Sequence, residues 1–255
     1  MTKTCSELFQ GMDCTIIGNG NEEVAGLAFR SDEVHPNDMF FCIVGTVVDG
    51  HSFAQDAIDR GATSLVAERK VYLADATDVT EVVVSDSRKA MAYASANYYD
   101  NPSRAFSLVG ITGTNGKTTT TYLVEHIASV AGNRCGVIGT VGNKIAGVME
   151  HAERTTPESP DLQKLFARMR DAGCTVVAME VSSHALDLRR TWDTDFAVTA
   201  FTNLTQDHLD YHHTFDDYFE AKALLFSKDY PARRVISIDG SWGRELLRRC
   251  TAAGD

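Results

Sequence analysis

The sequence lacks any hydrophobic run long enough to cross a membrane, and its first residues do not form a secretory signal. Its six cysteines are scattered and include no Cys-x-x-Cys pair, which argues against both a zinc site and a disulfide framework. We therefore expect reduced thiols, a cytoplasmic location and no membrane partner.

Positive charge is also scarce, because 24 lysines and arginines face 35 aspartates and glutamates, giving a formal net charge of −11. No basic run offsets this balance, so the surface should repel nucleic acid and anionic lipid. We expect no nucleic-acid partner. An anionic substrate must then be captured locally, by backbone N–H groups, a few basic side chains and a metal ion.

The sequence does contain strand patterns that alternate with helix patterns, which predicts an α/β fold with a mostly parallel sheet. The segment Asp100-Asn101-Pro102-Ser103 interrupts the alternation, so we expect a small domain over 1–103 and a second domain over 104–255 that is incomplete at its end. The expected strands are 39–44, 63–67, 81–84, 106–111, 136–141, 174–181, 196–204 and 235–238. The expected helices are 51–60, 86–99, 160–171, 214–227 and one from Lys117 that stops at Gly132. In this last helix Leu123, Ile127 and Val130 lie at helical spacing, and Gly142-Asn143 is expected to form a turn.

The most informative segment is the turn of small residues between the strand 106–111 and the helix at Lys117. Its glycines let several N–H groups point at one place, beside the positive end of the helix dipole, where a polyphosphate can bind. Lys117 adds a charge for the terminal phosphates, and the Thr118 hydroxyl can hold Mg²⁺. The usual pattern G-x-x-x-x-G-K-[ST] has Ile111 at its first position here, and a plain strand-to-helix turn is the alternative interpretation.

A carboxylate, Glu180, follows the apolar strand residues 176–179, and Ser182, Ser183 and His184 come directly after it. In an open parallel sheet, ligands bind at the carboxyl ends of the strands, the same edge that presents the phosphate-binding turn. Glu180 is therefore a candidate Mg²⁺ ligand. The alternative is an ordinary exposed glutamate at a strand end.

Residues 201–213 follow another buried strand and contain three histidines and two aspartates within seven residues. Their spacing does not fit a zinc enzyme, so Mg²⁺ and phosphate are the better partners, with His212 and His213 expected as solvated loop residues. Lys222 lies in a helix between alanines and large apolar residues. Such a lysine ordinarily extends its amine to solvent, but partial burial would make it a reactive amine.

Taken in order, these motifs resemble the Mur ligase family. The resemblance rests on 113–119, Thr155-Thr156-Pro157, 180–186, 203–212 and Glu220-Ala221-Lys222. Within the family, the chain is similar to the enzymes that add the third peptide residue to UDP-N-acetylmuramoyl-L-alanyl-D-glutamate. This resemblance implies an ATP-dependent amide-bond ligase of peptidoglycan synthesis, which uses an acyl-phosphate intermediate and takes diaminopimelate or lysine as its diamino acid.

The resemblance also implies roles for particular residues. ATP would be bound by Gly113, Thr114, Asn115, Gly116, Lys117, Thr118 and Thr119. Mg²⁺ would be held by Thr118, Glu180, His208 and Lys222, the last as a carbamate, and the catalytic set would be Lys117, Glu180, His208 and Lys222. The first domain would bind the UDP substrate. The substrate contacts would be Phe29, Ser31, Thr46, Val47, Val48, Thr155, Thr156, Ser182 and Arg190.

Two alternatives share the phosphate-binding turn. One is another ligase of the superfamily, such as a folylpolyglutamate synthetase or a different Mur ligase. The UDP-substrate-binding first domain that the resemblance implies favours the third-residue enzyme. The other is a non-catalytic module that binds a nucleotide or a UDP-sugar, because the family's C-terminal domain for the incoming amino acid is missing here. For the chain alone, we expect substrate binding with little or no ligation.

Overall fold

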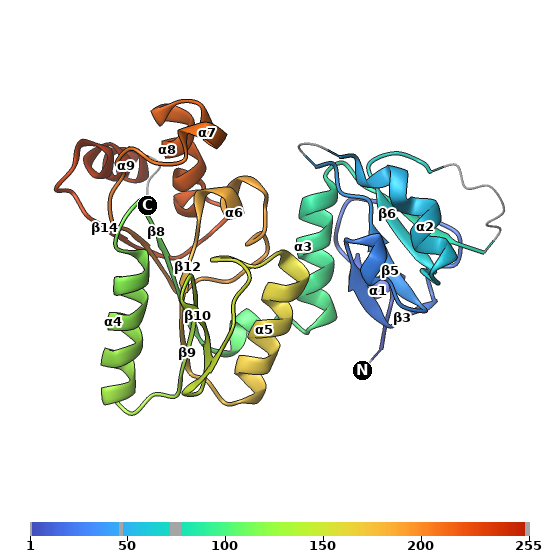
Figure 1. The fold of residues 1–255 in the computed structure, drawn as a ribbon, viewed down its shortest axis with the longest axis horizontal. Coiled ribbons are helices and arrows are strands. Elements are labelled where there is room, and N and C mark those ends of the chain that lie inside the picture. The colour runs from blue at the N-terminus through green and yellow to red at the C-terminus, as the bar shows by residue number, and fades with distance from the viewer. Residues whose placement is uncertain (1, 46–47, 72–77, 253–255) are drawn as a thin grey trace. The chain divides into compact units, whose positions relative to one another are not determined.

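The structure is a computed structural model that describes residues 2–45, 48–71 and 78–252 (Figure 1). The chain forms two compact units, Met1–Asp100 and Asn101–Asp255. Both units are α/β with mostly parallel sheets, which confirms the predicted fold class. Among the described residues, no helix has the length and apolar character needed to span a bilayer.

The first unit is built on a five-stranded sheet in the order β2-β7-β6-β5-β4, in which only β2 runs antiparallel. The strands are β2 (Thr15–Ile17), β4 (Gly26–Ala28), β5 (Asp38–Phe41), β6 (Ser64–Ala67) and β7 (Thr80–Val83). A separate antiparallel pair joins β1 (Lys3–Thr4) to β3 (Glu23–Val24). The helices are α1 (Cys5–Leu8), η1 (Ser31–Glu33), η2 (Gly50–Phe53), α2 (Ala54–Asp59) and α3 (Ser87–Tyr98).

Alternation along the central strands fills two cores, one on each face of this sheet. Met39 and Phe41 pack in one core with residues of α1 and α3, whereas Phe40 packs in the other with residues of α2. Continuous apolar strands are expected where helices cover both faces of a parallel sheet. Asp86 caps the N-terminus of α3, where the helix was expected to begin. Its carboxylate accepts hydrogen bonds from the N–H groups of Arg88 and Lys89 at 3.0 Å each.

The second unit has a seven-stranded sheet in the order β11-β10-β9-β12-β8-β13-β14. The parallel strands are β8 (Ser107–Thr112), β9 (Cys135–Gly139), β12 (Val176–Glu180), β13 (Val198–Phe201) and β14 (Arg233–Ile236). An antiparallel hairpin, β10 (Gly142–Ile145) and β11 (Val148–Glu150), forms one edge. The helices are η3 (Pro102–Ala105), α4 (Lys117–Val130), α5 (Ser159–Asp171), α6 (Ser183–Asp187), α7 (Leu209–His212), α8 (Phe215–Ala223), η4 (Leu224–Phe226) and α9 (Ser241–Ala252).

Helices α4 and α5 flank this sheet from opposite sides (Figure 1). Residues of α5, among them Phe166 and Met169, share a core with Val177 and Met179 of β12. Because β8, β9, β12 and β13 are parallel, the segments that follow them leave the sheet at one common edge, the arrangement that builds ligand sites in open α/β sheets.

Two local predictions were wrong. The expected strand 136–141 ends at Gly139, and Gly142, expected in a turn, begins β10 instead. The strand ends early because the Thr140 N–H donates to the Glu180 carboxylate, and Gly142 has a φ of +153°, which turns the chain into the hairpin.

The apolar stripe of α4 also does not face the core. Leu123, Ile127 and Val130 are 55%, 66% and 76% exposed, whereas Thr121 is fully buried. The reason lies at the start of the helix, where the Thr118 hydroxyl must face Glu180. Positions 118 and 121 lie on one face of a helix, so this contact turns the apolar stripe outward.

We predict that Gly110→Ala destabilises the second unit by about 1–3 kcal/mol, the usual cost of overpacking a core. Gly110 lies in the central strand β8, where an added Cβ would stand 2.5 Å from the Phe196 ring. The matched control is Gly240→Ala, because a Cβ there meets no atom within 4 Å. Urea unfolding of both variants checks this, and equal midpoints would contradict it.

Candidate functional site

Nine of the predicted residues meet in a pocket of about 310 Å³ at the carboxyl ends of β8, β9, β12 and β13. It is lined by Thr114, Asn115, Gly116, Lys117, Thr118, Thr140, Thr155, Glu180, Ser182 and His208. Segments more than 90 residues apart in the sequence thus contribute to one site, as the parallel order of the strands requires.

The turn between β8 and α4 is held in shape by the segment that follows β13. Gly113 has a φ of +143°, and a Cβ there would lie 2.0 Å from the Thr202 hydroxyl. The Thr114 N–H donates to the Asn203 carbonyl at 2.9 Å, and the Asn115 N–H donates to the Asn203 side chain at 3.0 Å. Gly116, at the N-terminus of α4, also has a left-handed φ of +87°. The turn therefore uses two backbone conformations that glycine adopts readily.

Two lysines donate to the same backbone carbonyl in this turn. The Lys117 ammonium donates to the Gly113 and Thr114 carbonyls at 2.9 Å each, and the Lys222 ammonium donates to the Gly113 carbonyl at 3.0 Å. Lys222 is 1% exposed and its ammonium lies 4.4 Å from the centre of the Tyr218 ring. Within the described residues, neither ammonium forms an ion pair with a carboxylate.

This crowding changes the acid–base behaviour of both lysines. Burial, together with the positive charge of Lys117, lowers the pKa of Lys222 to about 7. Burial also lowers the pKa of Lys117, although the negative charges of Glu180 and Asp207 oppose the shift. The site therefore holds buried positive charge that an anionic ligand would stabilise.

Glu180 forms the floor of the pocket and is 1% exposed. Its Oε1 accepts hydrogen bonds from the Thr118 hydroxyl and from the Thr140 N–H, both at 2.9 Å. The close approach of β9 needs a glycine, because a Cβ on Gly139 would lie 2.3 Å from that oxygen. A carboxylate and a hydroxyl from two different elements thus face one point beside the phosphate-binding turn.

Thr155 and Ser182 also line the pocket, and Thr156 lies beneath them at 1% exposure. The Thr155 hydroxyl is 3.0 Å from that of Thr140. The Thr156 hydroxyl donates to the Glu180 carbonyl at 2.8 Å and accepts from the Ser182 N–H at 3.1 Å. These bonds fix the end of β12 relative to the segment that precedes α5.

Five predicted residues of this unit do not line the pocket: Gly113, Thr119, Thr156, Arg190 and Lys222. Thr119 is exposed in the first turn of α4. The buried Arg190 guanidinium lies 2.8 Å from the Glu158 carboxylate and donates to the Thr156 carbonyl at 3.2 Å. Arg190 thus binds partners within the protein, and its contact with a substrate stays a prediction.

His208 reaches the pocket from the residue just before α7 and keeps 44% of its side chain exposed. Its Nε2 lies 3.4 Å from the Asp207 carboxylate. No cluster of three or more His, Cys, Asp or Glu side chains suited to a metal occurs among the residues that the structure describes. A cation in this site would therefore need ligands beyond such side chains, for instance Thr118, phosphate oxygens and water.

His212 was expected to be a solvated loop residue, and this was wrong. It is 5% exposed, and its Nε2 lies 2.9 Å from the Ser183 hydroxyl. Burial lowers the pKa of His212, and the nearby His184 contributes to the same shift. The expectation for His213 was correct, since that side chain is exposed. Nothing in the local sequence distinguishes the two histidines, because burial here comes from α6 and α8.

The remaining predicted residues belong to the first unit. Phe29 is half-buried against a core of that unit, Val48 is 51% exposed, and Thr46 and Val47 lie outside the described residues. Ser31 begins η1 and hydrogen-bonds to Asp56, which with Arg60 lowers the pKa of that carboxyl. Their roles toward a substrate stay predictions.

Thr140, Thr202 and Tyr218 help to form or support the site but were not predicted from the sequence. Thr140 binds Glu180, and Thr202 supports the turn, with its hydroxyl donating to the Asn115 carbonyl at 2.7 Å. The Tyr218 hydroxyl lies 3.2 Å from that of Thr114. Thr140 and Thr202 could have been predicted from the sequence, because each directly follows a strand of the parallel sheet.

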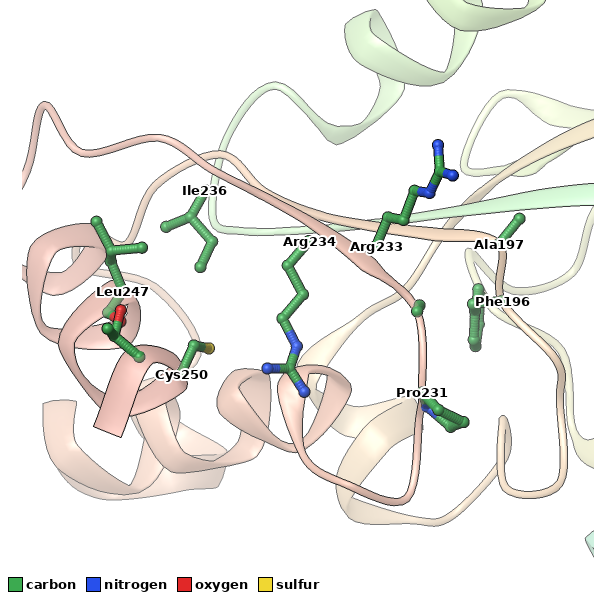
Figure 2. A pocket seen from close by; sticks show the side chains of 10 residues that line it. Phe196, Ala197, Pro231, Arg233, Arg234, Ile236, Leu247 and Cys250 are labelled. Atoms are coloured by element: carbon green, nitrogen blue, oxygen red, sulfur yellow. The ribbon is translucent and has the colours of Figure 1, made fainter. Parts of the chain in front are cut away.

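A larger hollow of about 930 Å³ lies between β14 and α9 and shares no lining residue with the first pocket (Figure 2). Its lining is mostly apolar, with Phe196, Ile236, Leu247 and Cys250, and the Arg234 side chain extends between Cys250 and Pro231. None of the predicted site residues lies there. Polar chemistry is concentrated in the smaller pocket.

Comparison with known proteins places the chain in a family. Residues 111–254 match the Mur ligase middle domain, and residues 23–111 match the catalytic domain of the Mur ligase family. A solved structure of a UDP-N-acetylmuramoyl-L-alanyl-D-glutamate–2,6-diaminopimelate ligase superposes with a TM-score of 0.82 at 26% identity, covering 99% of this chain and 50% of that chain.

Two curated relatives have the same name as that structure. The one from Clostridium botulinum is 43% identical over 243 residues, 95% of this chain and 50% of the relative. The one from Geobacillus thermodenitrificans is 49% identical over 209 residues, 82% of this chain and 42% of the relative. The chain thus spans about half the length of the curated relatives it matches, and it belongs to the Mur ligase family.

Proposed function

We propose that this chain is the nucleotide- and UDP-substrate-binding part of an ATP-dependent ligase that adds a diamino acid to UDP-N-acetylmuramoyl-L-alanyl-D-glutamate in peptidoglycan synthesis. The observation that carries the proposal is the pocket in which Lys117, Thr118, Glu180 and His208 meet. The names of the relatives favour diaminopimelate over lysine as the added residue. The cytoplasmic location stays a prediction.

The pocket suits the triphosphate of ATP for electrostatic reasons. The N–H groups at the start of α4 and the positive end of the helix dipole face the pocket, and the turn is already in its left-handed conformation at Gly116. The ammonium group of Lys117, which donates to the Gly113 and Thr114 carbonyls, would gain a charged phosphate partner. A strongly acidic protein would capture an anion in this way.

The donor set also suits Mg²⁺, which prefers oxygen ligands and keeps several waters or phosphate oxygens. Thr118 and Glu180 already place their oxygens 2.9 Å apart, and His208 lines the same pocket. A carbamate on Lys222 would add a further carboxylate. When bound, the ion would neutralise phosphate charge and align the reacting groups.

The reaction we infer proceeds in two steps. The substrate carboxylate attacks the γ-phosphate of ATP, so that ADP leaves and an acyl phosphate forms. The amine of the diamino acid then attacks the acyl carbon and phosphate leaves. Lys117 and the N–H groups at the start of α4 would stabilise the charge on the transferred phosphoryl group, while Thr155 and Ser182 would contact the incoming substrate.

The alternatives explain less. A folylpolyglutamate synthetase or a different Mur ligase would share the turn, but the first unit also matches a Mur ligase domain and the relatives named above act on the UDP-linked dipeptide. A binding module without catalysis remains the expected behaviour of residues 1–255 alone. An assay of ADP release beside calorimetric binding of the UDP-linked dipeptide separates binding from turnover, and failure to bind either substrate would contradict the proposal.

We predict that Lys117→Ala weakens ATP binding by about 10- to 100-fold, the effect of losing a charge-assisted hydrogen bond. Glu180→Gln should leave metal-free ATP binding unchanged but abolish its enhancement by Mg²⁺, since the carboxylate charge is lost. Isothermal titration with and without Mg²⁺ measures both effects. The control is Lys164→Ala, which removes an exposed lysine of α5. A Lys117→Ala variant that binds ATP as tightly as the control would refute the assignment.

We predict that Lys222 reacts with carbon dioxide, because a buried amine with a pKa near 7 is largely neutral at pH 8. In ¹³C-bicarbonate, NMR should show a carbamate signal that grows from pH 6 to pH 8, as the ammonium loses its proton. Lys222→Ala should remove the signal, and Lys228→Ala, which removes an exposed lysine, should retain it. A signal that survives in Lys222→Ala would show that another amine is modified.

A further inference from the structure

The direction of the His208 side chain depends on a short and unusual segment. His208 precedes α7 with a φ of +51°, and His213 follows α7 with a φ of +62°. Both are non-glycine residues in the left-handed region, which persists only where surrounding contacts hold the backbone. A four-residue helix has little stability of its own, so contacts outside α7 must supply this support.

Two side-chain hydrogen bonds join α7 to α6. The His212 imidazole, through Nε2, lies 2.9 Å from the Ser183 hydroxyl, and the Tyr211 hydroxyl donates to the Asp187 carboxylate at 2.7 Å. The first pair is almost fully buried, with His212 at 5% and Ser183 at 1% exposure, whereas Asp187 is exposed. Because a buried polar group that loses its partner is costly, the Ser183–His212 bond constrains α7 more strongly.

The partner of His212 is fixed to the site. Ser183 is the first residue of α6, which is capped by Ser182, whose hydroxyl accepts from the Ala185 N–H at 3.1 Å. Ser183 also follows Glu180 by three residues, at the end of β12. The Ser183–His212 bond therefore connects the segment that carries His208 to the strand that carries the buried carboxylate.

The imidazole of His212 is also held by rings around it. The Tyr218 ring lies 5.1 Å away at an interplanar angle of 32°, and the His184 ring lies 5.4 Å away. Tyr218 in turn lies near the His208 ring, at 6.1 Å, and beneath the Lys222 ammonium. Because these rings restrict rotation of the His212 side chain, its bond to Ser183 holds α7 in a fixed position relative to α6.

We propose that His212 is a positioning residue, which holds α7 against α6 through Ser183 so that His208 faces the pocket of Thr118 and Glu180. This inference rests on the proposed function, because it assumes that His208 contacts a divalent cation bound with ATP. The His212 side chain itself does not line the pocket. It acts on the cation site through the backbone of α7, where the His212 N–H donates to the His208 carbonyl at 3.0 Å.

The test measures Mn²⁺ affinity by electron paramagnetic resonance in the presence of saturating ATP, and ATP affinity in EDTA by calorimetry. We expect His208→Ala, His212→Leu and Ser183→Ala each to weaken Mn²⁺ binding about tenfold, the effect of losing a residue that orients a metal ligand. The double variant of His212 and Ser183 should be no weaker than either single variant. His212→Gln, whose amide can reach Ser183, should recover most of the affinity, and ATP affinity in EDTA should stay unchanged.

The matched control is His213→Asn, which removes the neighbouring exposed histidine, keeps a residue type that tolerates its positive φ, and should bind Mn²⁺ as the unchanged protein does. If His208→Ala weakens Mn²⁺ binding while His212→Leu and Ser183→Ala do not, the positioning role is wrong and the proposed function stands. If His212→Leu lowers ATP affinity in EDTA equally, the residue supports the fold in general and the inference is again wrong. If the unchanged protein shows no ATP-dependent Mn²⁺ binding, both proposals fall.

Discussion

Two ammonium groups, those of Lys117 and Lys222, donate hydrogen bonds to the single carbonyl oxygen of Gly113 in a mostly buried place. Like charges at such proximity repel each other, and burial removes the water that would screen them. This arrangement can be stable only if the backbone supplies acceptors and the lysines lower their proton affinity, and the pKa values of both lysines are indeed depressed. An anionic ligand would relieve the repulsion, which supports the proposed binding of a triphosphate here.

The sheet of the second unit positions the turn between β8 and α4 opposite the Glu180 carboxylate. The parallel order of β8, β12, β9 and β13 brings the phosphate-binding turn, Glu180, Thr140 and Asn203 to one edge. Glycines at 113 and 139 allow approaches that any Cβ would block. The net charge of −11 should discourage non-specific anions, whereas the proposed site would bind one anion through fixed groups.

Much of this follows from local patterns. The alternation of apolar strands with helices predicts the parallel sheet, because β12 is buried on both faces. The chemistry of Lys117, Thr118 and Glu180 is also visible in the sequence, because each residue stands directly beside a predicted strand or helix end. Their meeting in one pocket follows from the sheet rule, although their roles toward ligands stay proposals.

The failures have a common cause. The helical spacing of Leu123, Ile127 and Val130 predicts a buried stripe, but α4 is rotated by the contact between Thr118 and Glu180, 62 positions apart in the sequence. His212 and His213 look equivalent as neighbours, yet only His212 meets Ser183. Neighbouring residues were enough to predict the α/β class and the polar residues at strand and helix ends that line the pocket. The rotation of α4, the burial of His212 and the depressed lysine pKa values depend on groups that folding brings together, so no local pattern could predict them.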